Sequence, residues 1–211
     1  MISKKILLTA IILILFTVSA VSAAENAIDD GANIDDNGQE IIAADEETND
    51  EPDGIFGSFT HLNETIYENN HHEVKLTFNY TYYGDDEEDQ NFNGGINLHR
   101  NVTIYGNGNT ISGSNSARIF VIENCNVTFR DIIFTNANQG EFSWGGAIWI
   151  GSGGDCTAIN CTFIDNHAWY GGAMKGGTAI NCTFRGNSAA YGGGIYSGNA
   201  YNCLFKDNRA D

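Results

Sequence analysis

The chain repeats itself every 21 residues towards its C-terminus, and this period restricts its fold more than any other feature. Each copy begins with an aromatic residue and a Gly-Gly pair. It continues through a segment of the type Asn-Cys-Thr-Phe, and an asparagine follows three residues after the phenylalanine. The cysteines of the three copies, Cys161, Cys182 and Cys203, are equally spaced. A repeat of this length is too short for a pair of helices or a propeller blade, but it matches one coil of a solenoid.

The residues of the repeat favour strands and sharp corners over helices. Gly, Asn, Thr, Ile and Phe recur in the copies, and the single proline, Pro52, precedes them. β-Branched and aromatic residues fit strands, whereas Gly and Asn fit tight turns. The pattern of the leucine-rich repeat, another short solenoid repeat, is absent. We therefore predict an all-β solenoid with two or three short parallel strands in each coil.

Alternation along a strand predicts which side chains fill the solenoid. In segment 180–184, the side chains of Ile180, Cys182 and Phe184 are expected to point inward. The same rule places Tyr201 of the next copy inward. Because successive coils lie about 4.8 Å apart, equivalent residues should stack into ladders. The predicted ladders are Cys161–Cys182–Cys203, Phe163–Phe184–Phe205 and Asn166–Asn187–Asn208, with the asparagines in the left-handed conformation at a corner.

The first residues have the order of a secretory signal peptide. Lys4 and Lys5 precede an apolar run over 6–16, and small residues lead to a cleavage site after Ala23. We assign residues 1–23 to this signal. The alternative is an uncleaved membrane anchor over 6–24, and both interpretations export the rest of the chain.

The acidity of the chain belongs to its N-terminal part. Residues 25–89 contain 20 acids and one lysine, whereas residues 90–211 contain seven acids and seven Lys or Arg. Segment 24–54 is acidic and poor in large apolar residues, so we interpret it as a disordered tether. Cation binding at its Asp-Asp pairs is the alternative. No nucleic-acid partner is expected, because phosphate binding requires clustered basic residues.

Five cysteines in an exported chain usually indicate disulfides, but the spacing favours another interpretation. Stacked cysteines have parallel Cα–Cβ bonds, which is poor disulfide geometry. We expect Cys161, Cys182 and Cys203 to be buried free thiols that act as small apolar side chains. A disulfide of Cys156 is the alternative, and the states of Cys125 and Cys156 stay open. No metal site is expected, because no Cys-x-x-Cys pair occurs.

Segment 55–94 differs from the repeats that follow it. Residues 62–66 are expected to form a short helix and residues 74–78 a strand, and we interpret the segment as an N-terminal cap. The repeats then occupy 95–211, with about five coils at this period. The sequence stops just after a repeat corner, so we expect a truncated chain, or a partner that covers the last coil.

The combination of Gly-Gly-Ala-Ile with Asn-Cys-Thr-Phe-x-x-Asn-x-Ala, as in 145–148 and 160–168, resembles known surface-protein repeats. It is similar to the repeats of polymorphic outer membrane proteins and of adhesin-like surface proteins, including those of methanogenic archaea. The resemblance covers about 59–211. It implies a right-handed parallel β-helix and a location at the cell surface. Such proteins usually continue to a C-terminal anchor, which we expect to be missing from this sequence, so the mode of anchoring is open.

The residues most suited to binding a ligand are aromatic and lie in register from copy to copy. Alternation turns one row outward, and Lys175 is expected to lie between the aromatic faces of Trp149 and Tyr196. The candidate ligand-binding residues are Trp149, Lys175 and Tyr196 in this row, and Trp144, Tyr170 and Tyr191 before the Gly-Gly pairs. The alternative is that these side chains only cover the coil flank.

Carbohydrate-active enzymes share the β-helix fold, but they need clustered carboxylates, and the acids of 95–211 are dispersed. Asp165 and Asp207 occupy related positions two coils apart, at about 9–10 Å. We interpret both as corner residues that face water and His167 as a loop residue. No catalytic residue is therefore expected. Candidate glycosylation sites are Asn63, Asn79, Asn101 and Asn126. Further sequons occur at Asn160 and Asn181, where either glycosylation or the strand repeat alone accounts for the Asn-Cys-Thr sequence.

Together these observations predict a secreted, cell-surface, non-enzymatic protein that serves adhesion or envelope display. The expected partner is a surface glycan or protein, without a cofactor. Membrane attachment is expected only through the signal segment or a missing C-terminal anchor. The alternatives are a fragment of a carbohydrate-active β-helix enzyme, of the pectate lyase or glycoside hydrolase type, and a purely structural spacer.

Overall fold

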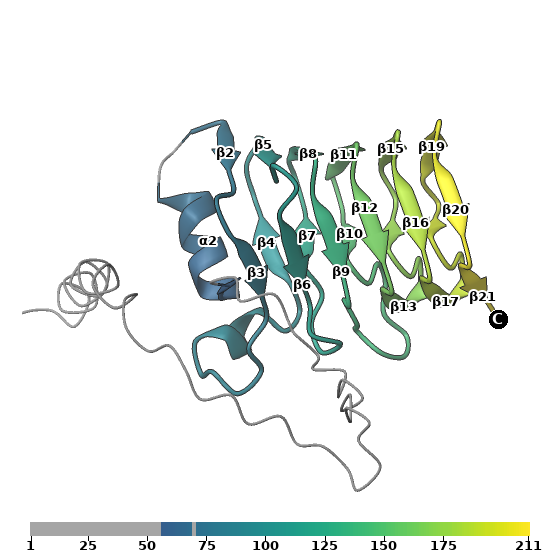
Figure 1. Ribbon diagram of the computed structural model, residues 1–211, viewed down its shortest axis with the longest axis horizontal. Helices are drawn as coiled ribbons and strands as arrows, with labels where there is room; N and C mark the ends of the chain where they lie inside the picture. Colours follow the sequence, from purple (N-terminus) through teal and green to yellow (C-terminus); the bar gives the residue numbers. More distant parts are fainter. Residues whose placement is uncertain (1–55, 69–70) are drawn as a thin grey trace, which may run out of the picture. The chain divides into compact units, whose positions relative to one another are not determined.

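The computed structural model describes residues 56–68 and 71–211. The segments assigned to the signal peptide, 1–23, and to the tether, 24–54, lie outside the described residues. The described chain forms a right-handed parallel β-helix, in which stacked coils build continuous sheets (Figure 1). This confirms the fold class that the repeat predicts.

The strands of the described residues form four sheets, and every pairing is parallel. A six-stranded sheet contains β2 (Glu73–Lys75), β5 (Val102–Tyr105), β8 (Asn126–Arg130), β11 (Asp155–Ile159), β15 (Thr178–Ile180) and β19 (Asn199–Tyr201). A seven-stranded sheet contains β1 (Phe56–Gly57), β3 (Asn79–Thr81), β6 (Thr110–Ser112), β9 (Ile133–Thr135), β12 (Thr162–Ile164), β16 (Thr183–Arg185) and β20 (Leu204–Lys206). A five-stranded sheet contains β4 (Ile96–Leu98), β7 (Phe120–Ile122), β10 (Ile148–Ile150), β14 (Met174–Lys175) and β18 (Ile195–Tyr196). A three-stranded sheet contains β13 (His167–Tyr170), β17 (Ser188–Tyr191) and β21 (Arg209–Ala210).

From β4 onward, each coil adds one strand to each of the three larger sheets. The strands from β5 to β19 in the six-stranded sheet correspond to five coils within 95–211. A sixth coil lies within 55–94, because β2 pairs with β5 and β3 pairs with β6. The segment interpreted as a cap therefore also begins the solenoid.

The phenylalanine ladder forms the centre of the core. The rings of Phe163 and Phe184 stack with centroids 4.7 Å apart, and those of Phe184 and Phe205 are 4.8 Å apart. Phe134 extends the ladder by one coil, at 4.9 Å from Phe163. These distances equal the spacing of the coils, so each ring contacts its copies above and below.

The cysteine ladder consists of free thiols, of which Cys161 and Cys182 belong to the core and Cys203 packs against it. The backbone N–H of Cys161 donates to Sγ of Cys182 at 3.4 Å, and that of Cys182 donates to Sγ of Cys203 at the same distance. All five cysteines are free, including Cys125 and Cys156, which are buried. Burial raises the pKa of the Cys156 thiol strongly, because an apolar interior disfavours the thiolate.

The predicted alternation is wrong at the residue before the corner. Ala179 is buried, whereas Ile180 is only half-buried, and the equivalent Tyr201 is 59% exposed. The reason is Asn181, which has a φ of 54° and separates β15 from β16. A residue in the left-handed conformation turns the chain, so the period of two does not continue across it.

The asparagine ladder exists, but it is not in the left-handed conformation. The residues with positive φ precede it, at Asp165 (53°), Gly186 (67°) and Asp207 (54°). The buried side chain of Asn187 instead connects coils. Its Oδ1 accepts from the backbone N–H of Asn166 at 3.0 Å, and its Nδ2 donates to the carbonyl of Phe163 at 3.0 Å. The ladder therefore satisfies backbone groups that the corner leaves without strand partners.

Each position of the Gly-Gly pair requires glycine for a different reason. Gly171 adopts a φ of 70°, which non-glycine residues rarely adopt. Gly172 has no space for a side chain, because a Cβ atom there would lie 2.2 Å from the carbonyl oxygen of Gly193 in the next coil. The pair thus allows a sharp turn directly against the neighbouring coil.

A helix covers the first coil, as the sequence of 62–66 predicts. Helix α2 (Phe59–Tyr67) buries Phe59, Leu62 and Ile66 against the core. Its first backbone N–H groups are satisfied by Asp89, at the start of the 3-10 helix η1 (Asp89–Phe92). The fully buried Asp89 carboxylate accepts from the backbone N–H groups of Phe59 at 3.1 Å, Thr60 at 2.7 Å and Tyr83 at 2.9 Å.

Candidate functional site

The outer face of the five-stranded sheet carries the first row of candidate residues. Trp149 on β10 pairs with Lys175 on β14, and Lys175 pairs with Tyr196 on β18. The preceding residues Ile148 and Met174 are fully buried, so alternation turns the row outward. All three side chains of the row are half-buried.

The second row lies beside the first, at the corner before the Gly-Gly pairs. Trp144 pairs with Tyr170, and Tyr170 pairs with Tyr191. The rings of Tyr170 and Tyr191 stack with centroids 5.1 Å apart and an interplanar angle of 12°. Trp144 is 44% exposed and Tyr191 is 52% exposed. This row therefore presents large apolar surface to solvent.

Ring contacts join the two rows into one surface. The centroids of Trp144 and Trp149 are 6.0 Å apart with the rings edge to face, and those of Tyr170 and Tyr196 are 5.1 Å apart. The structure thus brings all six candidate residues together. We name this surface the aromatic flank, and it consists of Trp144, Trp149, Tyr170, Lys175, Tyr191 and Tyr196.

The expected position of the Lys175 ammonium group is wrong. Its Nζ lies 5.0 Å from the ring centre of Trp144, and not between Trp149 and Tyr196. The guanidinium carbon of Arg118 lies 5.1 Å from the ring centre of Trp149. The cation beside Trp149 is therefore Arg118, from the preceding coil, and not Lys175. Tyr196 packs against Tyr170.

A pocket opens at the Trp144 end of the aromatic flank. It has a volume of about 310 Å³ and is lined by Arg118, Phe142, Ser143, Trp144 and Trp149. Phe142 is 75% exposed and stacks on Trp169 with centroids 5.0 Å apart. The Ser143 hydroxyl donates to the carbonyl of Gly140 at 2.7 Å.

Of the residues that line the pocket, Trp144 and Trp149 are predicted from the sequence, and the other three are not. Arg118 precedes β7, and Phe142 and Ser143 lie in the connection between β9 and β10. None of the three has a counterpart in the 21-residue copies. The comparison of copies that identified the aromatic rows therefore contains no signal for them.

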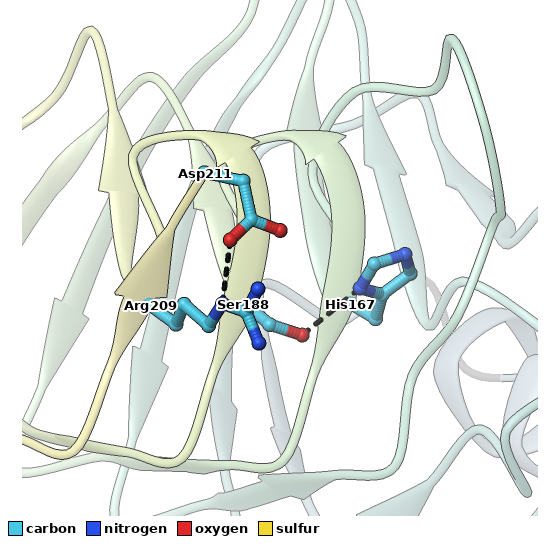
Figure 2. A network of polar contacts seen from close by, with 4 residues as sticks. All are labelled: His167, Ser188, Arg209 and Asp211. Carbon is cyan, nitrogen blue, oxygen red and sulfur yellow. Dashed lines mark hydrogen bonds and ion pairs between the residues drawn. The ribbon is translucent and has the colours of Figure 1, made fainter.

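His167 and Ser188 form a polar pair on the three-stranded sheet. His167 begins β13, so its interpretation as a loop residue is wrong. Its Nδ1 lies 2.9 Å from Oγ of Ser188, the paired residue on β17 (Figure 2). The nearby Asp211 carboxylate accepts from Nε of Arg209 at 2.5 Å. In a nucleophilic triad the third group orients the base. The Asp211 carboxylate instead binds Arg209.

The two acids considered for catalysis occupy equivalent corners. Asp165 and Asp207 both follow strands of the seven-stranded sheet and have φ angles of 53° and 54°. Both are exposed, and Gly186 takes the same place in the coil between them. Asp, Asn and Gly are the residues that tolerate this conformation, so the turn accounts for the identity of all three.

The sequons lie at different depths. Asn126 is exposed, and so are Asn160 and Asn181 at their corners. Asn63 is half-buried on α2. The side chains of the other two bind the next coil. Oδ1 of Asn101 accepts from the backbone N–H of Asn126 at 2.8 Å, and Oδ1 of Asn79 accepts from that of Thr110 at 2.9 Å.

Within 56–68 and 71–211, no three His, Cys, Asp or Glu side chains are grouped so that they could hold a metal ion. The helices of this part of the chain are too short or too polar to cross a membrane. No family model matches the chain, and no match was found among curated proteins or solved structures.

Proposed function

We propose that this chain is an exported, adhesin-like protein of the cell surface that binds its ligand through the aromatic flank. The observation that carries the proposal is the gathering of all six candidate residues on one surface. Contiguous exposed aromatic side chains on a soluble protein usually mark an interaction site. The expected ligand is a surface glycan or protein, and the proposed role is adhesion or envelope display.

The rigidity of the solenoid supports the proposal. Each aromatic residue of the flank is held by a parallel strand or by the Gly-Gly corner next to it. The phenylalanine and asparagine ladders behind these strands fix the spacing of the coils. A binding surface on such elements loses little conformational entropy when a ligand binds.

The test replaces the two most exposed residues of the flank. The double variant Trp144→Ser/Tyr191→Ser keeps the strands and the Gly-Gly corners. Binding of the exported chain is measured on the producing cells and on an immobilised panel of neutral and acidic oligosaccharides. We expect binding to fall at least about tenfold, because exposed aromatic anchors dominate such interfaces.

The control is Tyr201→Ser on β19, which removes an exposed tyrosine outside the flank. Circular dichroism verifies that all variants keep their strand content. Unchanged binding by a folded double variant would overturn the proposal. Cell-surface display is tested separately by labelling intact cells with a reagent that does not cross membranes.

A further inference from the structure

Arg118 is a buried cation without an opposite charge. Its residue is 7% exposed, and its Nε and Nη1 donate to the carbonyls of Gly145 at 2.9 Å and Gly94 at 2.8 Å. The described chain provides no carboxylate partner for it, and Nη2 makes no hydrogen bond there. Burial lowers the pKa of Arg118 to about 10, and it stays charged at neutral pH. A buried charge without a partner is rare in proteins.

One of the residues that line the pocket beside Arg118 has a polar group without a partner. The indole Nε1 of Trp149 is buried without a hydrogen bond to any described residue. None of the five residues that line the pocket is acidic. The ammonium group of Lys175 lies on the same surface, 5.0 Å from the ring centre of Trp144. Although the whole chain has a net charge of −17, this pocket and its rim carry two cations.

We propose that the pocket binds an acidic sugar, with its carboxylate at the Arg118 guanidinium and its ring against Trp144. This inference rests on the proposed function of the aromatic flank and names the class of ligand. A volume of about 310 Å³ is at the lower end of the usual range for small-molecule sites and suits a single sugar ring. Aromatic walls with a few polar groups are typical of such sites.

A glycan chain fits the surroundings of the pocket better than an acidic peptide does. The flank continues from Trp144 over the next two coils through Tyr170 and Tyr191, whose rings contact one another. These rings offer further flat apolar surfaces to neighbouring sugar units. Their hydroxyl groups can bind sugar hydroxyls.

The first experiment compares ligands that differ only in charge. Trigalacturonic acid and its methyl ester are titrated into the full chain, and binding is measured by isothermal calorimetry. Sialyllactose and its carboxyl methyl ester form a second pair, which distinguishes a hexuronic acid from a sialic acid as the source of the carboxylate. We expect the acid of at least one pair to bind at least about tenfold more tightly than its neutral counterpart, because a charge-assisted hydrogen bond is lost in the latter.

The second experiment changes the cation. Arg118→Gln removes the charge and is compared with Arg185→Gln, which removes an exposed arginine on β16. We expect only Arg118→Gln to abolish the preference for the acid. If Arg118→Gln does not fold, the inference is tested only by the first experiment, which compares the acid and the neutral ligand on the unaltered chain.

The outcomes separate this inference from the proposed function. Equal binding of acid and neutral ligand overturns the inference, but it leaves the proposed function intact if the Trp144→Ser/Tyr191→Ser variant still loses binding. Absence of binding to all four sugars also overturns the inference. The proposed function is then tested by comparing the binding of the Trp144→Ser/Tyr191→Ser variant and of the unaltered chain to cells.

Discussion

The side-chain amide of Asn166 donates a hydrogen bond of 2.9 Å to Oδ1 of Asn187 in the next coil. Nδ2 of Asn187 donates in turn to Oδ1 of Asn208 at 2.8 Å. The same amides bind backbone groups of the adjoining corners. This ladder therefore connects three coils through their corners, and its middle member makes hydrogen bonds in both directions.

We expect Asn187→Ala to lower the free energy of unfolding by roughly 2–4 kcal/mol, because it leaves buried backbone groups without partners. The carbonyl of Phe163 and the backbone N–H of Asn166 both lose a hydrogen bond. Urea unfolding followed by circular dichroism measures the effect. The control Asn126→Ala, at an exposed position, should cost less than about 0.5 kcal/mol. Equal losses in the two variants would show that the ladder is not a source of stability.

The second glycine of the Gly-Gly pair provides a steric test of the packing of the coils. A Cβ atom at Gly172 would lie 2.2 Å from a carbonyl oxygen of the next coil, whereas one at Gly94 would meet nothing within 4 Å. We expect Gly172→Ala to cost at least about 2 kcal/mol and Gly94→Ala to be nearly neutral. Thermal unfolding of both variants measures the difference. A Gly172→Ala variant as stable as the parent chain would mean that the coils are not in such close contact.

Much of the fold follows from the sequence, because repetition defines it. The 21-residue spacing predicts the parallel stacking and the register in which Phe163, Phe184 and Phe205 meet. Face assignment from alternation succeeds within strands but fails across Asn181. At the corner after the phenylalanine, two neighbouring residues both favour a positive φ, such as Gly186 and Asn187. Residue type alone therefore does not show that Gly186, and not Asn187, adopts it.

The sequence predicts only part of the candidate site. The aromatic rows are found because copies repeat them, and Trp149 and Lys175 are paired as the spacing predicts. Arg118 is found only in three dimensions, since it reaches Trp149 from the preceding coil and belongs to no copy. The same holds for Asp89, whose role at the start of α2 depends on a contact between residues about 30 positions apart.

The buried Asp89 gives a test of the cap. Asp89→Ala removes the acceptor for the first N–H groups of α2, and we expect it to cost about 3 kcal/mol. Hydrogen exchange at the amides of Phe59 and Thr60 should accelerate more than exchange in the phenylalanine ladder. The control is Asp85→Ala, an exposed acid of the same segment. An unchanged exchange rate at Phe59 in Asp89→Ala would contradict the stabilisation of the start of α2 by the Asp89 carboxylate.

The buried Cys156 thiol should make the stability of the chain sensitive to alkaline pH. Burial raises the pKa of the Cys156 thiol, so the folded chain keeps this proton at a pH at which the unfolded chain has lost it. The folded state then binds more protons than the unfolded state. Stability is fully present below the unfolded pKa, about 8.5, and declines as the pH rises above it. One such thiol contributes a slope of about −1.4 kcal/mol per pH unit.

The variant Cys156→Val isolates this contribution, because Cys156 stacks on Val127, which stacks on Val102. Valine should fit the same ladder and removes the titrating proton. Unfolding in urea is measured between pH 8 and pH 10 with a reductant present, and the slope of the variant should be shallower than that of the parent chain by about 1.4 kcal/mol per pH unit. Parallel slopes would show that the thiol ionises equally well in the folded and unfolded states. That result would contradict a dry, closed core at this position.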